Sequence, residues 1–352
     1  MIRSASLAAF AGFSAFSLLH GSARADDVLK QTSKADFVVP GAAGADKKEP
    51  PKVPEGWNPR LSLGMTASFG DNRGVVGQAD GATLAFGLKF ESGLDYRRGG
   101  HEWRNTLNLG EGLTRTPTLP VFVKSVDLLS LESIYLYHVT PWFGPFVRAT
   151  MLTSMFRGAD VRAAPVTYQI TRVNGIVDTE VGSRLALSDP FQPMTLKQSV
   201  GPFLRPVERE DINVEIRAGL GAQETLAKGQ LAGVDDEATP VIEIKELASV
   251  NQIGVEAAAD IWGTVSDKRV TYRLGVDLMI PLAHTALVAG DTRSSVDLMN
   301  VELGGQLSFK LVEWASLDYQ VKAIREPQVL DAFQVRNSLL LTMGPSYTAD
   351  KK

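Results

Sequence analysis

The stretch Ala82–Arg97, ATLAFGLKFESGLDYR, alternates between apolar and polar side chains. Its even positions are apolar apart from Ser92, whereas its odd positions carry every charge. Successive side chains of a β-strand point to opposite faces, so the pattern predicts a strand with one apolar and one polar face. The stretch is much longer than an ordinary strand of about 5–6 residues. A strand this long is typical of a transmembrane barrel, where the apolar face meets lipid and the polar face lines the interior.

The same alternation recurs along the chain and predicts further strands. With the first stretch included, they cover residues 60–69, 82–97, 101–114, 121–140, 141–157, 193–206, 211–224, 250–265, 270–282, 296–311, 315–325 and 331–344. Their number is even, as a single-chain bacterial barrel requires. The sequence therefore predicts an all-β fold, a twelve-stranded antiparallel transmembrane β-barrel with short periplasmic turns and long external loops.

The predicted connections are long after each odd-numbered strand and short after each even-numbered one. Residues 158–192 and 225–248 alternate poorly, so we interpret them as two long external loops. Residues 121–140 are apolar on both faces, which fits either a wide part of the wall or an inner face packed against a plug. A soluble β-sandwich or lipocalin-like barrel would also alternate, but it would use shorter strands and bury its apolar face.

The first residues have the features of an export signal. Arg3 precedes an apolar run, Ala8–Leu19, and Ala23-Arg24-Ala25 is a small-x-small cleavage site. We predict a cleaved signal peptide at 1–25, a disordered leader rich in proline and lysine at 26–59, an outer-membrane barrel at 60–347 and a tail at 348–352. The predicted location is the outer membrane of a Gram-negative bacterium.

Composition excludes several classes of function. The formal net charge is −4 and cysteine is absent. Nucleic-acid binding requires a clustered basic face, and without cysteine there is no thiolate chemistry. With four histidines in the chain, one of them inside the predicted signal peptide, a histidine-rich metal site is not expected. We expect no metal and no cofactor.

The polar faces of the predicted strands carry charges of both signs. The candidate lumen-lining residues are Lys89, Glu91, Asp95, Arg97, Arg104, Glu215, Arg217, Glu256, Asp260, Arg273, Asp277, Glu302, Lys310, Asp318, Lys322 and Arg336. The same alternation also predicts that Glu102, Arg148, Lys197 and Arg205 face inward. They could line a channel for a small polar solute, or they could pair with one another and close the interior. The mixed signs argue against a strong preference for anions or cations.

Aromatic residues cluster at the end of the predicted barrel where the short turns lie. The candidate members of an interface girdle are Tyr96, Trp103, Tyr137, Trp142, Trp262, Trp314 and Tyr347. Catalysis needs a nucleophile beside its base. His101, His138 and His284 have no serine with an acceptor at a matching strand position, so we predict no catalytic residues and no enzymatic activity.

The signal, the leader and the long alternating strands, with the motif DYRRGGHEWRNTL at Asp95–Leu107, resemble an outer-membrane β-barrel family of unknown function. The resemblance implies the fold and the location but no substrate. One departure is the end of the last strand, where Tyr347 takes the place of a terminal aromatic residue and a short tail follows.

We therefore expect a narrow pore or transporter for small polar solutes. The alternative is a structural or docking component of an outer-membrane assembly with an occluded lumen. The expected partners are outer-membrane lipid and a protein bound through residues 26–58 or the external loops.

Overall fold

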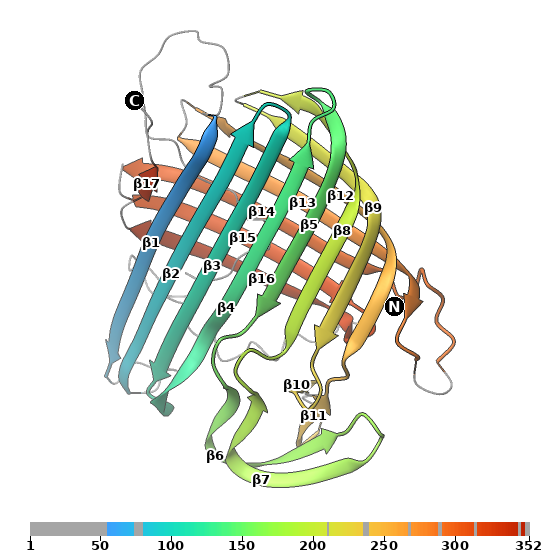
Figure 1. Ribbon diagram of the computed structural model, residues 1–352. Helices are drawn as coiled ribbons and strands as arrows, with labels where there is room; N and C mark the ends of the chain where they lie inside the picture. Colours follow the sequence, from blue (N-terminus) through green and yellow to red (C-terminus); the bar gives the residue numbers. More distant parts are fainter. Residues whose placement is uncertain are drawn as a thin grey trace, which may run out of the picture.

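Long β-strands make up most of this protein, as a computed structural model of the chain shows (Figure 1). The structure describes residues 55–73, 80–209, 211–234, 239–266, 269–287, 291–312, 315–343 and 346–348. The predicted signal peptide and nearly all of the predicted leader lie outside these ranges. No helix within them is long and apolar enough to cross a membrane.

The strands form two sheets. The larger, antiparallel sheet has thirteen strands in the order β16-β15-β14-β13-β12-β9-β8-β5-β4-β3-β2-β1-β17. Its members are β1 (Gly56–Asn72), β2 (Gly81–Arg98), β3 (His101–Thr116), β4 (Leu119–Tyr137), β5 (Phe143–Thr153), β8 (Met194–Glu208), β9 (Asn213–Leu226), β12 (Val250–Val265), β13 (Val270–His284), β14 (Asn300–Val312), β15 (Ala315–Glu326), β16 (Leu330–Met343) and β17 (Ser346–Thr348).

Each of the twelve predicted strands overlaps a strand of this larger sheet. Two connections are shorter than predicted, because the strands beside them extend further. β3 and β4 are joined by Pro117 and Thr118 alone, where the Thr116 hydroxyl accepts a hydrogen bond from the Leu119 N–H at 3.2 Å. β15 and β16 are separated by residues 327–329. The prediction of long connections after the third and eleventh strands was wrong.

The two segments predicted as long loops instead form the smaller sheet. Its strands are β6 (Gly158–Thr171), β7 (Val177–Ser188), β10 (Leu231–Gly233) and β11 (Ile242–Glu246), in the order β10-β11-β6-β7. It lies beyond one end of the larger sheet (Figure 1). The prediction missed it because an irregularity interrupts the β6–β7 ladder and because β11 pairs in parallel with β6. Neither feature leaves a local pattern in the sequence.

The two sheets have opposite distributions of polarity. In the smaller sheet Tyr168, Ile170, Leu185 and Ile244 pack together as a buried apolar cluster. In the larger sheet the buried side chains are mainly polar or charged, and large apolar side chains are exposed. On β9, for example, Leu220 is 58% exposed whereas Glu215 is 1% exposed. The alternation along each strand therefore places the charges on the protected face of the larger sheet.

The larger sheet curls so that charged side chains from strands far apart in its order meet. Arg104 on β3 lies 3.0 Å from Glu215 on β9, although β4, β5 and β8 lie between these strands. Lys197 on β8 lies 3.3 Å from Glu302 on β14, again four strands along the order. A flat sheet would separate such strands by about 19 Å, since neighbouring strands are about 4.8 Å apart. In Figure 1, β13 to β16 accordingly pass behind β1 to β5.

The two ends of the strand order also come together. β17 pairs with β1 through Arg60↔Thr348, Leu61↔Tyr347 and Ser62↔Ser346. β17 follows β16 in the chain after residues 344 and 345, and β1 also contacts β16. The first strand and the last segment of the chain are thus neighbours.

Candidate functional site

A continuous row of alternating charges crosses the protected face of the larger sheet. We call it the charge chain, and its members in order of contact are Arg97, Glu102, Arg104, Glu215, Arg217, Asp260 and Arg273. The successive N···O distances are 2.8, 3.6, 3.0, 3.2, 2.7 and 3.5 Å. These residues come from β2, β3, β9, β12 and β13, so the row depends on the curl of the sheet.

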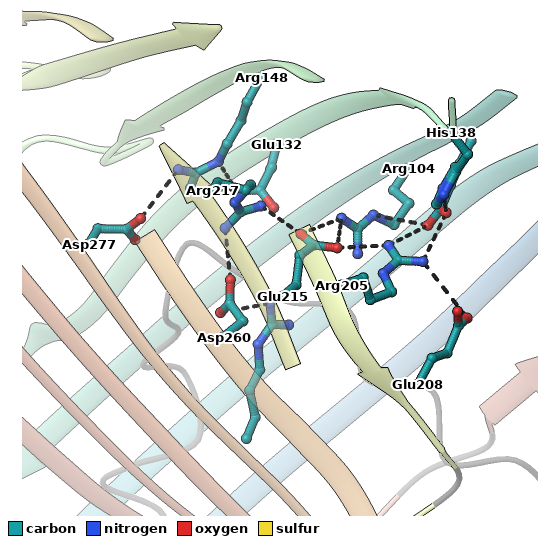
Figure 2. Close-up of polar contacts among 12 residues, drawn as sticks. Arg104, Glu132, His138, Arg148, Arg205, Glu208, Glu215, Arg217, Asp260 and Asp277 are labelled. Atoms are coloured by element: carbon teal, nitrogen blue, oxygen red, sulfur yellow. Dashed lines mark hydrogen bonds and ion pairs between the residues drawn. The ribbon is translucent and has the colours of Figure 1, made fainter. Parts of the chain in front are cut away.

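Glu215 is the centre of this arrangement. Its carboxylate forms ion pairs with Arg104 and Arg217 of the charge chain. It also forms an ion pair with Arg205, whose Nη2 lies 2.7 Å away (Figure 2). Arg205, on β8, also reaches Glu102 at 3.2 Å. An isolated buried carboxylate would be costly, and the surrounding guanidinium groups stabilise its ionised form.

A cavity of about 150 Å³ lies beside the charge chain. All seven members of the chain line it, together with two further carboxylates and two aromatic residues: Asp95, Glu132, Tyr96 and Trp262. The lining thus combines four arginines with five carboxylates. One water needs about 10–15 Å³ of such a cavity, so this space can hold several waters.

Two more ion-pair clusters lie across the interior. Arg148 on β5 contacts Glu132 at 2.7 Å, Glu256 at 3.6 Å and Asp277 at 3.8 Å. Lys197 lies 3.3 Å from Glu302 and 3.5 Å from Glu326, and Lys322 lies 3.0 Å from Glu302. The cavity that several of these side chains line is only about 20 Å³, so the interior is narrower here than beside the charge chain.

The inner face of β4 is apolar next to these charges. Ile134 and Leu136 pack against Phe146 of β5 and Phe203 of β8, and all four side chains are at most 2% exposed. His138 stacks edge-on against Phe203 and its Nε2 lies 2.7 Å from Glu102. Among the described residues, side chains of β5 and β8 therefore cover the apolar part of the inner face of β4.

The remaining candidate lumen residues pair more locally. Lys89 contacts Glu91 at 2.8 Å, and Asp95 contacts Arg60 of β1 at 2.8 Å. A Cβ atom at Gly93 would lie 2.8 Å from the Arg60 Nε, so glycine leaves room for that pair. Asp318 accepts hydrogen bonds from Ser308 and Ser316. Lys310 is half-buried, and the side chain of Arg336 lies outside the described part of the structure.

The predicted girdle residues are placed in three ways. Trp103, Tyr137 and Trp142 are exposed, and Tyr96 is half-buried, with its ring 4.9 Å from that of Trp57 on β1. Trp262 instead lines the cavity, since it shares the parity of Glu256 and Asp260 on β12. Trp314 and the Tyr347 side chain fall outside the described residues.

Asn105, which interrupts the apolar face of β3, has a local explanation. Its Nδ2 donates to the Leu94 carbonyl at 3.0 Å, and its Oδ1 accepts a hydrogen bond from Ser133 at 2.8 Å. The Ser133 hydroxyl in turn accepts from the Trp103 indole N–H at 2.9 Å. This polar group on the apolar face is therefore satisfied within the protein.

The structure brings four further residues that were predicted to face inward into these clusters: Glu102, Arg148, Lys197 and Arg205. Another member of the clusters, Glu132, was not among the predicted residues. Glu132 left no comparable signal, because β4 is apolar on both faces. His101 contacts the Tyr135 hydroxyl, and His284 contacts Gln328.

No family model matches this chain, and no curated protein matches it. An outer membrane channel from Pseudomonas putida F1 is 12% identical, with a TM-score of 0.37, and covers 86% of this chain and 100% of its own. The beta domain of the Bordetella autotransporter Brka is 10% identical, with a TM-score of 0.30, over 82% and 97%. The Pseudomonas putida toluene transporter TodX is 9% identical, with a TM-score of 0.28, over 84% and 90%. These likenesses are too low to carry an argument about this chain.

Proposed function

We propose that this chain is a closed, twelve-stranded β-barrel in the outer membrane of a Gram-negative bacterium, and that its interior is a narrow pore for small polar solutes. The observation that carries the proposal is the distribution of polarity on the larger sheet. Side chains such as Leu220, Ile253 and Leu274 are more than half exposed, whereas Glu215, Arg217 and Asp260 are buried. A large apolar surface is unfavourable in water and suits contact with hydrocarbon.

The smaller sheet supports a membrane boundary between the two sheets. Its apolar cluster of Tyr168, Ile170, Leu185 and Ile244 is buried, as expected of a sheet surrounded by water. One chain thus carries both distributions of polarity, and the change occurs where β5 leads into β6 and β9 leads into β10. A soluble barrel of the lipocalin type would have a buried apolar face throughout.

Closure is supported by the strand order. If β16 and β17 are two parts of one final strand, the larger sheet contains twelve wall strands and its last strand pairs with its first. Closure removes the exposed sheet edges that a bilayer cannot satisfy with hydrogen bonds. The even strand number also returns the last strand to the side where β1 begins.

The pore proposal rests on the interior. Charges of both signs line it, and the cavity beside the charge chain has the volume of a few water molecules. Ion pairs across the interior reduce the cross-section further. Such a lumen would pass small polar solutes and exclude large ones.

Planar bilayers test this function directly. The purified full-length protein should insert and produce small, discrete current steps in salt solution. Changing Glu215 to Ala should alter the step size, because this carboxylate holds three arginines of the interior. Protease protection of the protein in lipid vesicles verifies that it inserts. A protein that inserts but gives no measurable current would contradict the pore.

A docking role is the second candidate, and the smaller sheet favours it. Val177 and Val181 of β7 are exposed, and β7 is an outer strand of this sheet. Cross-linking in outer membranes would compare the full chain with variants lacking residues 26–54 or 158–188. Loss of a specific cross-linked species in either variant would support docking, and identical cross-linked species in all three would contradict it.

A further inference from the structure

We propose that the cavity beside the charge chain is a binding site for small zwitterions, molecules the size of the smallest amino acids that carry one positive and one negative group. This inference rests on the proposed pore and names its class of solute. It follows from the alternation of charges in the lining, from the network of contacts that each charge already makes, and from the volume of the cavity.

Every inner member of the charge chain contacts two opposite charges. Arg217, for example, lies 3.2 Å from Glu215 and 2.7 Å from Asp260. Asp260 in turn also lies 3.5 Å from Arg273. A guanidinium has five N–H donors and a carboxylate has about four acceptor positions, so a member of the charge chain with two partners can bind a further one. Neighbouring opposite charges along the wall therefore form ready-made pairs of subsites.

A solute with one charge fits this wall poorly. An anion that binds one arginine draws it away from its carboxylate and lies beside that carboxylate, and a cation meets the reverse problem. Leaving one buried charge without its partner is strongly destabilising. A zwitterion can insert between an arginine and its carboxylate, and it gives each of them a new partner. Only a solute that carries both charges leaves neither the arginine nor the carboxylate without a replacement partner.

The volume and the surroundings limit the solute to a small one. A cavity of about 150 Å³ has room for a molecule the size of the smallest amino acids. Glu215, Arg217, Asp260 and Glu102 are at most 5% exposed, so the charged wall is built into the fold rather than being a mobile surface. Trp262 also lines the cavity, which places an indole ring where it can report binding.

Tryptophan fluorescence of the full-length protein in detergent micelles measures binding without requiring a current. Glycine should change the emission in a saturable way. Acetate, methylammonium and the uncharged glycolamide should each bind at least tenfold more weakly. The variant Trp262→Phe should lose most of the glycine-dependent signal, which assigns the signal to this cavity.

Two arginine variants provide the matched comparison. Arg273→Gln should weaken glycine binding at least tenfold, because Arg273 ends the charge chain in the cavity wall. Arg325→Gln should leave glycine binding unchanged, because Arg325 pairs with Asp331 and does not line this cavity. Heat-modifiable migration on gels verifies that each variant is folded.

The proposal is overturned if wild-type protein binds acetate or methylammonium as well as glycine, or if none of the four probes binds. That comparison uses wild-type protein, so it holds even when a variant fails to fold. Glycine binding without conductance would contradict the pore but not the site. Conductance without preference for glycine would contradict the site but not the pore.

Discussion

Arg104 Nη2 lies 3.0 Å from the Oε1 of Glu215, although three strands separate the two residues in the order of the sheet. This contact joins opposite parts of the curled wall. It makes the charged face an interior, where a carboxylate that is 1% exposed is held by Arg104, Arg205 and Arg217.

The first prediction concerns this carboxylate. Glu215→Gln should lower the free energy of unfolding by about 3–5 kcal/mol, because it removes a buried negative charge that three guanidinium groups share. Urea unfolding in phospholipid vesicles measures the change. Glu208→Gln is the control, since Glu208 is half-exposed and lies 3.8 Å from Arg205. We expect the control to lose less than about 1 kcal/mol, and equal losses in both variants would contradict the structural role of Glu215.

The second prediction tests the membrane boundary with one substitution at two exposed apolar sites. Leu220→Arg, on the apolar face of the larger sheet, should cost about 2–4 kcal/mol in vesicles, because it places a charge in hydrocarbon. Val181→Arg, on β7 of the smaller sheet, should change stability by less than about 0.5 kcal/mol. The two side chains are 58% and 69% exposed, so exposure alone predicts the same small effect for both. Equal effects in vesicles would argue against lipid at Leu220.

The third prediction concerns the apolar cluster inside the wall. Phe203 is completely buried against Ile134, Leu136 and Phe146, so Phe203→Ala should cost about 3–5 kcal/mol. Phe69→Ala should cost less, because the Phe69 side chain is 70% exposed. Unfolding of both variants under identical vesicle conditions provides the comparison. Equal losses of stability in the two variants would contradict the stabilising role of this cluster.

The fourth prediction concerns pH and the smaller sheet. Burial raises the pKa of Tyr168 to about 12, and the hydrogen bond that its hydroxyl donates to Asp160 at 2.8 Å adds to the shift. A tyrosine in an unfolded chain has a pKa of about 10. The contribution of Tyr168 to stability is therefore complete below pH 10 and is lost as the pH rises from about 10 to about 12.

Tyrosinate absorbance measures this ionisation. The difference between the titration curves of the wild type and Tyr168→Phe should show one tyrosine that ionises near pH 12. A difference curve with its midpoint near pH 10 would contradict the buried position of this ring. The comparison needs no assumption about the membrane, because Tyr168 lies in the smaller sheet.

The sequence by itself determined the twelve long strands of the larger sheet and the face of that sheet on which their side chains lie. Alternation in a strand is local, since each residue points opposite to its neighbour whatever the rest of the chain does. The segment Ala82–Arg97 therefore predicted β2 almost to its ends, and Asp211–Glu224 predicted β9 within a few residues. The same parity identified all seven members of the charge chain as inward-facing candidates.

Only the tertiary structure decided which charges meet. The contacts of Arg104 with Glu215 and of Lys197 with Glu302 join strands that are far apart in the sheet, so they depend on its curvature. The same holds for the parallel pairing of β11 with β6, which turns two apparent loops into a second sheet. Alternation specifies a direction for each side chain, whereas a partner across the interior is specified by the path of the whole wall.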